Sequence, residues 1–395
     1  MPWNPNTTME LKEEFVHLAI QPNTNISELC RRFGISRPTA YKWLARYEAH
    51  GQKGLVERSR RPAHQPNQTP PEVEQLVVKL RGKQRAWGAR KLRAHLRRQA
   101  QQGEVAVEAA QIPSASTITR ILQRHDLLGQ PEAPSRQGPW QRFEYERPNQ
   151  LWQMDFKGEF RLGNGRWCYP LTILDDHSRF SPLVGGCANT KRQGVRGRLI
   201  SVFRRYGLPQ AILCDNGPPW GSPKRFADGS PHYTKLAAWL MRLGIEVKYS
   251  SPAHPQTHGK NERFNGTLQA EVLAYHQFQD LGHANEHLEQ WRQHYNTQRP
   301  HQALDMEVPV RRYRPSNRPY PQRLPPVEYG PDDIVRKVSA KGIISVANKS
   351  FRVGKAFDGF PVALRARPSS QSHTYGVYYC NHHIRTIKLT KKLKS

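Results

Sequence analysis

The spacing of apolar residues divides the chain into three regions with different patterns. Residues 8–128 carry apolar positions three and four apart, which is the period of amphipathic helices. Residues 151–268 mix short apolar runs with helical stretches, and residues 332–390 consist of short strand-like runs separated by turn residues. The pattern therefore predicts a multidomain chain with an all-α beginning, an α/β centre and a small all-β end.

The first module, residues 1–58, has helix start and stop signals in a helix-turn-helix order. A helix over 8–20 precedes a second one that Asn25 or Ser27 can cap and Gly34 can end, and Ser36 can cap a third with Pro38 in its first turn. A small core is predicted from Ile26, Leu29, Phe33, Ile35, Ala40 and Leu44. We expect the third helix to face a DNA groove with Arg37, Thr39, Lys42 and Trp43. The alternative is a three-helix bundle with a solvated basic face.

A second helical module is predicted over 72–135, after a basic linker over 59–71. The linker either follows a phosphate backbone or is simply solvated. Helices are expected near 72–80, 88–98 and 114–124, and basic residues that include Arg90 and Arg93 crowd the outer face of the middle one. We interpret the module as a second helix-turn-helix-like DNA-binding domain, followed by a polar linker over 129–139.

The central domain, residues 140–314, is predicted to begin with three antiparallel strands near 151–160, 167–175 and 180–187. Helices near 191–206 and 232–243 then alternate with strands near 210–215 and 245–249. Pro252 and Pro255 keep the next segment out of a helix until Lys260, after which Phe264, Leu268, Val272 and Tyr275 form an apolar stripe.

Three acidic residues stand where these elements can bring them together. Asp155 lies within one strand, Asp215 ends another before a turn, and Glu262 lies in the first turn of a helix, off its apolar stripe. Such carboxylates can hold two divalent cations, which activate an attacking oxygen and stabilise a leaving one in phosphoryl transfer. The plainer interpretation of Glu262 is an acid that complements the helix dipole.

Five segments carry a family resemblance: WQMDF, LTILDDHSR, LCDNG, SPAHPQTHGKNERFNGTL and YNTQRPHQAL. In this order, over about 148–305, they resemble the DDE transposases of the IS481 and IS3 insertion-sequence groups, whose core is RNase H-like and of the retroviral-integrase type. The resemblance implies that Asp155, Asp215 and Glu262 are the catalytic, metal-binding triad. It also implies two Mg²⁺ ions as cofactors, for which Mn²⁺ may substitute. The separation between Asp215 and Glu262 is longer than in many relatives, and we interpret 218–231 as a surface insertion.

Neighbouring polar residues receive lesser roles. Lys260 and Arg263 flank Glu262 and are expected to contact DNA phosphates. In the resemblance, Asp175 and Asp176 are structural, and Asp176 is a supporting residue beside the site at most. The segment 295–304 is basic and aromatic, so it either touches phosphates or packs. Cys380, His382 and His383 are interpreted as ordinary strand or turn residues rather than metal ligands.

The end of the chain adds a Pro-rich linker over 315–331 and a basic domain over 332–395. Its six short strands predict a small β-barrel, similar to the C-terminal DNA-binding domain of the family. The whole chain has 61 Lys and Arg against 32 Asp and Glu, a formal charge of +29, which indicates a polyanionic partner. No apolar run is long enough to span a membrane, and five scattered cysteines do not suggest a disulfide framework.

These observations predict a transposase that binds the terminal inverted repeats of its element, cuts the 3′ ends and joins them to target DNA. Its partners are then double-stranded DNA and further copies of itself, and we expect it in the bacterial cytoplasm, associated with the nucleoid. Two alternatives stay open: a non-catalytic DNA-binding regulator, and a stand-alone nuclease on the same fold.

Overall fold

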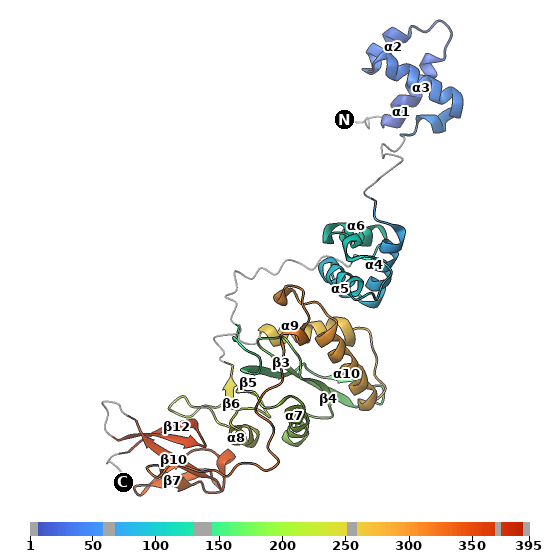
Figure 1. The fold of residues 1–395 in the computed structure, drawn as a ribbon. Coiled ribbons are helices and arrows are strands. Elements are labelled where there is room, and N and C mark those ends of the chain that lie inside the picture. Colours follow the sequence, from blue (N-terminus) through green and yellow to red (C-terminus); the bar gives the residue numbers. More distant parts are fainter. Residues whose placement is uncertain (1–6, 58–67, 129–143, 251–258, 368–372, 390–395) are drawn as a thin grey trace. The chain divides into compact units, whose positions relative to one another are not determined.

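The computed structural model describes residues 7–57, 68–128, 144–250, 259–367 and 373–389 (Figure 1). The chain separates into two compact units, Met1–Gln68 and Thr69–Ser395. Most of the basic linker, the linker at 129–139 and the loop before Gly259 lie outside the described residues. Within the described part, no helix is long and apolar enough to cross a membrane.

The first unit contains three helices, α1 (Thr8–Ala19), α2 (Ile26–Phe33) and α3 (Arg37–His50), followed by the short 3₁₀ helix η1 (Gly51–Leu55). The caps of α2 are those that the sequence predicts: the Asn25 side chain accepts from its first turn, and Gly34 ends it in the left-handed conformation. Ser36 precedes α3 as predicted, but its side chain makes no capping hydrogen bond. Phe15, Val16, Leu29, Cys30, Ala40 and Leu55 form its buried core. The helix-turn-helix order is therefore built on a small but complete core.

The second unit begins with α4 (Pro71–Lys83), α5 (Ala89–Gln101) and α6 (Ala115–Arg124), with the 3₁₀ turn η2 (Ala109–Gln111) between the last two. Ser114 caps α6 by accepting from the backbone of Thr117. The core of this module includes Trp87, which is fully buried, together with Leu92, Leu96, Ile118 and Ile121. The three predicted helices are all present.

A mixed sheet forms the centre of the second unit. It consists of β1 (Leu151–Phe156), β2 (Phe160–Arg161), β3 (Trp167–Asp175), β4 (Leu183–Cys187), β5 (Ala211–Cys214) and β6 (Glu246–Tyr249). The order β2-β3-β1-β5-β6 places β1 between antiparallel β3 and parallel β5, and β4 also pairs with β3. This agrees with the predicted succession of three antiparallel strands followed by alternating helices and strands, and β2 is an additional short strand that pairs with β3.

Helices cover both faces of this sheet (Figure 1). The helices α7 (Arg192–Tyr206) and α8 (Lys235–Arg242) pack on one face, where Trp152, Met154 and Ile173 are buried. On the other face, Cys168, Leu174 and Val184 share a core with α9 (Gly259–Leu268), the π-helical turn η4 (Gln269–Leu273) and α10 (Leu281–Thr297). The short elements η5 (Gln302–Leu304) and α11 (Pro309–Arg312) follow.

The apolar stripe of α9 ends earlier than the sequence predicts. Phe264, Leu268 and Val272 are buried as expected, but Tyr275 is 54% exposed. The reason is that the α-helix passes into η4 and then into a turn, so the helical spacing no longer carries Tyr275 onto the inner face.

The Pro-rich segment after α11 lies along the core through specific contacts. Ser316 donates its backbone N–H to Tyr206, and Arg318 donates to the carbonyl oxygens of Pro209, Leu243 and Gly244. These bonds order a stretch whose composition suggests only a linker.

The C-terminal region contains the six predicted strands. They are β7 (Ile334–Lys337), β8 (Ile343–Val346), β9 (Lys349–Arg352), β10 (Pro361–Ala366), β11 (Thr374–Tyr379) and β12 (His382–Lys388), with the 3₁₀ turn η6 (Lys355–Phe357) before β10. They form an open four-stranded sheet, β12-β11-β10-β7, and a separate hairpin of β8 and β9. A closed barrel is not confirmed, because β8 and β9 pair with each other and leave β7 and β12 as sheet edges in the described residues.

Candidate active site

The central strands bring two of the three candidate carboxylates side by side. β1 and β5 are parallel, and Leu151 pairs with Ala211. The same register, continued to the ends of the strands, places Asp155 level with Asp215. Neighbouring strands lie about 4.7–4.9 Å apart, so the two side chains leave the sheet as close neighbours.

Electrostatics place the third carboxylate in the same neighbourhood. Burial, the Asp215 carboxylate and the Glu262 carboxylate together raise the pKa of Asp155 to about 6. Asp155 is half-buried, whereas Glu262 is exposed in the first turn of α9. The fold therefore gathers negative charge at the carboxyl end of β1 and β5, and all three members of the predicted triad contribute to it.

A buried side chain that the sequence pattern does not single out supports Asp155. The Nδ2 group of Asn265 lies 3.4 Å from an Asp155 carboxylate oxygen, and its Oδ1 accepts from the Thr172 hydroxyl at 3.0 Å. That hydroxyl also lies 3.1 Å from the backbone oxygen of Asp155. Asn265 follows Glu262 by one helical turn, so this spacing is the signal that could have identified it.

Asp176 and Lys260 form an internal pair beside the site. The ammonium of Lys260 lies 2.6 Å from Asp176, whose side chain is almost fully buried. Gln153 donates to the same carboxylate oxygen and accepts from the backbone N–H of Asn261. These bonds tie the start of α9 to β1 and β3, so Lys260 helps to fix the helix that carries Glu262. Arg263 is exposed next to Glu262.

Asp175 is likewise engaged with the backbone. It is fully buried, and its carboxylate accepts from the backbone of Asn149 at 2.7 Å and from the backbone and hydroxyl of Ser178. This arrangement anchors the turn that follows β3 and leaves the carboxylate facing protein donors.

The chemistry of the three carboxylates fits a divalent cation. In the described chain, no group of three His, Cys, Asp or Glu side chains is close enough to hold a metal ion as it stands. Mg²⁺, however, keeps several waters and needs only one or two carboxylates. Burial first, and then the neighbouring carboxylates, raise the pKa of Asp155, and a bound cation would offset both effects by stabilising the ionised form.

The predicted DNA-contacting residues of the first unit differ in exposure. Arg37 and Lys42 are exposed on α3, and Thr39 is half-buried with its hydroxyl 2.9 Å from that of Ser36. Trp43 is also half-buried: its ring centroid lies 6.0 Å from that of Phe15, in the core of the module. The tryptophan is thus held by packing, while the two bases face solvent.

In the second module, Arg90 is exposed at the start of α5. Arg93 is half-buried and donates its Nε–H to the Pro113 carbonyl at 3.0 Å. One of the two predicted bases is therefore engaged in joining α5 to the segment before α6.

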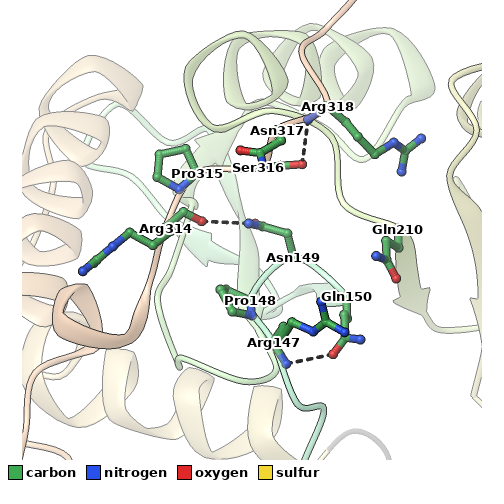
Figure 2. Close-up of a pocket in the computed structure, with 10 residues that line it drawn as sticks. All are labelled: Arg147, Pro148, Asn149, Gln150, Gln210, Arg314, Pro315, Ser316, Asn317 and Arg318. Carbon is green, nitrogen blue, oxygen red and sulfur yellow. Dashed lines mark hydrogen bonds between the residues drawn. The ribbon is translucent and has the colours of Figure 1, made fainter.

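A separate pocket of about 410 Å³ lies at the opposite ends of β1 and β5 (Figure 2). Asn149, Gln150 and Gln210, which precede the two strands, line it together with residues 314–318. The Asn149 amide donates to the Arg314 carbonyl there. Since the carboxylates stand at the other ends of the same strands, this pocket is distinct from the candidate active site.

Comparison with protein families assigns a domain to each region. An integrase core domain matches residues 145–255, and a second integrase core domain family matches 243–309. A helix-turn-helix domain matches 11–63, a homeodomain-like domain matches 39–122, and the C-terminal domain of IS481 family transposases matches 333–395. The helix-turn-helix and homeodomain-like matches precede the integrase core matches, and the transposase C-terminal match follows them, in the order that the sequence predicts; the homeodomain-like match runs across both predicted helical modules.

Similar proteins come from bacterial insertion elements. An uncharacterized 31.7 kDa protein of insertion element IS407 from Burkholderia multivorans is 27% identical over 74% of this chain and 92% of its own length. A 39.2 kDa protein of IS476 from Xanthomonas euvesicatoria is 31% identical over 41% of this chain and 44% of its length. Among solved structures, the HTLV-2 integrase catalytic core domain in complex with magnesium covers 43% of this chain and 99% of its own, with 17% identity and a TM-score of 0.32.

Proposed function

We propose that this chain is an IS481/IS3-type DDE transposase that binds the terminal inverted repeats of its element, cuts its 3′ ends and joins them to target DNA. The observation that supports the proposal is the parallel register of β1 and β5, which brings Asp155 level with Asp215, together with the contribution of the Glu262 charge to the raised pKa of Asp155. The helix-turn-helix domains and the formal charge of +29 support DNA as the substrate.

The carboxylates have separate roles in this proposal. Asp155 and Asp215, adjacent on parallel strands, bind the cofactor together, and Glu262 completes the set from α9. Two Mg²⁺ ions, when bound, supply Lewis-acid stabilisation of the attacking and leaving oxygens. Asn265 holds the Asp155 carboxylate, and the Lys260–Asp176 pair fixes the first turn of α9.

Water is the nucleophile in the first step, and the bond that breaks joins phosphorus to the bridging oxygen at the element's 3′ end. The freed 3′-hydroxyl then attacks a phosphodiester of target DNA and displaces another 3′-hydroxyl. No covalent link between protein and DNA is required. Because the two ends of an element are processed together, we propose that the active form contains more than one copy of the chain.

Removing one carboxylate charge at a time tests this proposal. Asp155→Asn, Asp215→Asn and Glu262→Gln should each reduce Mg²⁺- or Mn²⁺-dependent cleavage of a donor plasmid by at least about a hundredfold, since fewer anionic oxygens hold the cations. A mobility shift on terminal-repeat DNA should be unchanged.

Glu286→Gln is the matched control, because it removes one carboxylate charge from an exposed position on α10, and it should cleave like wild type. Wild-type cleavage by the Glu262→Gln protein would refute the assignment. Specific binding without any cleavage by the folded wild-type protein would favour the non-catalytic regulator instead.

A further inference from the structure

The segment after Asp215 is held in shape by contacts within itself. In this segment, residues 218–231, Arg225 and Pro231 make a β-bridge, and Phe226 donates its backbone N–H to Ser230. At its base, Trp220 is buried and its ring stacks on that of Phe156 at 5.5 Å, directly after Asp155. The segment is thus rooted beside two of the candidate catalytic carboxylates.

The tip of the segment is bonded to strand β12 of the C-terminal domain. The Asp228 carboxylate accepts from the backbone N–H of Thr386 at 2.8 Å. The Nε of Arg385 lies 3.9 Å from the same carboxylate oxygen, and its guanidinium carbon lies 4.2 Å from the ring centroid of Phe226. A hydrogen bond, an ion pair and a cation–π contact therefore converge on two residues of the tip.

Other contacts keep the C-terminal domain against the core. Tyr233, just after the segment, lies 6.0 Å from Phe357 between ring centroids, and residues of both domains belong to one continuous apolar cluster. The guanidinium carbon of Arg242 on α8 lies 5.4 Å from the ring centroid of Phe360. The tip of the segment adds a specific polar attachment to this apolar contact.

The same attachment brings cations of two domains together. Lys224 and Arg225 come from the segment, and Arg352 and Arg385 come from β9 and β12. The Phe226 ring, which Arg385 approaches to 4.2 Å, also stacks on the His232 ring with 3.9 Å between centroids. Burial lowers the pKa of His232, and the charges of Arg352, Arg385 and Lys224 lower it further. Arg225 also donates to the Asn216 side chain at 3.0 Å, next to Asp215.

We propose that residues 218–231 dock the C-terminal domain on the core and form with it a composite cationic surface that binds the phosphate backbone of duplex DNA beside Asp215. Lys224 and Arg352 supply charge to this surface, and Asp228 is a positioning residue. The inference rests on the proposed function, because it concerns the DNA on which the carboxylates act. It assigns a role to a segment that the sequence identifies only as a surface insertion.

Hydrogen exchange tests the docking in the full-length chain. Asp228→Ala removes the acceptor of the Thr386 N–H, so exchange at that amide should accelerate at least about tenfold, because its bond is lost. Asp228→Asn keeps an acceptor oxygen and should retain most of the protection. Asp332→Ala removes an exposed carboxylate from the same domain and should change nothing. Unchanged protection at Thr386 in Asp228→Ala would overturn the docking.

DNA affinity tests the composite surface, because the change expected for Asp228→Ala is opposite to the change that charge alone would cause. Asp228→Ala makes the protein more positive, so charge alone would strengthen DNA binding. The proposal instead predicts that the concentration of terminal-repeat duplex giving half-maximal binding rises about three- to tenfold, because the cations separate. The cleavage rate at saturating DNA should stay within about twofold of wild type, since the carboxylates are untouched.

A second variant removes the charges themselves. Lys224→Ala with Arg352→Ala should reduce the slope of log affinity against log salt by about two. If Asp228→Ala accelerates hydrogen exchange at the Thr386 amide but binds DNA as tightly as wild type, the composite surface is overturned. If the wild-type protein binds DNA but never cuts it, the proposed function fails. Hydrogen exchange at Thr386 and DNA affinity still test the docking and the composite surface in that case.

Discussion

The carboxylate of Glu271 lies 2.8 Å from Nε of Arg299, and both side chains are more than nine-tenths buried. Glu271 belongs to η4, the continuation of the helix that carries Glu262. Its two oxygens also accept from the indole N–H groups of Trp87 and Trp291. One acidic residue thus joins the second helical module to the helix of the candidate active site.

Glu271→Ala should destabilise the second unit by about 3–5 kcal/mol, because it leaves Arg299 buried without its counter-charge and two indole donors without an acceptor. Chemical unfolding of the full-length chain measures the change. Glu286→Ala, an exposed substitution on α10, is the control and should lie within about 0.5 kcal/mol of wild type. If Glu271→Ala lowers the free energy of unfolding no more than the control does, the Glu271–Arg299 pair contributes no net stability.

Asn265→Leu should reduce metal-dependent cleavage by about ten- to a hundredfold, which is typical of losing a partner that orients a metal ligand. The substitution keeps the volume of the side chain and removes its contacts with Asp155 and Thr172. Gln269→Leu, on an exposed position one turn later, is the control. Cleavage and the thermal midpoint are measured together, and a folded Asn265→Leu protein with wild-type cleavage would contradict the role.

Lys91 makes the free energy of unfolding depend on pH. Burial, and then the nearby charge of Arg299, lower the pKa of Lys91 to about 8. Below pH 8 the amine is protonated in both folded and unfolded chains, so the full cost of burying its charge is present. As the pH rises from about 8 toward 10.5, the unfolded state binds more protons and the free energy of unfolding increases.

Lys91→Met should therefore stabilise the protein at pH 7 by about 1–3 kcal/mol, since one pKa unit corresponds to about 1.4 kcal/mol. The difference from wild type should shrink when unfolding is measured at pH 9.5. If Lys91→Met increases the free energy of unfolding equally at both pH values, packing and not the buried charge causes the increase.

DNA binding by the full-length chain should fall steeply with salt. With a formal charge of +29, we expect several Lys and Arg side chains to displace counterions from the duplex. If six or more phosphates are contacted, affinity should drop by at least about 10³ between 50 and 200 mM salt. Fluorescence anisotropy on a labelled duplex measures this, and a nearly flat salt dependence would contradict an electrostatic interface.

The sequence by itself determined the elements and their order, because those depend on local chemistry. Asn25 and Gly34 delimit α2, Ser114 starts α6, and the short apolar run before Asp215 forms β5. The family motifs also point to the three candidate carboxylates, one within a strand, one at the end of a strand and one in the first turn of a helix, and their catalytic role remains a prediction. The predicted roles of the DNA-contacting residues remain predictions.

The tertiary structure decided which of these residues meet, because long-range contacts have no local signal. Asn265 reaches Asp155 from 110 positions away, and Asp228 reaches Thr386 from 158 positions away. Strand pairing likewise left the C-terminal sheet open, although its six strands were predictable one by one. Local patterns fix where strands begin and end, whereas closure and docking depend on how whole surfaces pack against each other.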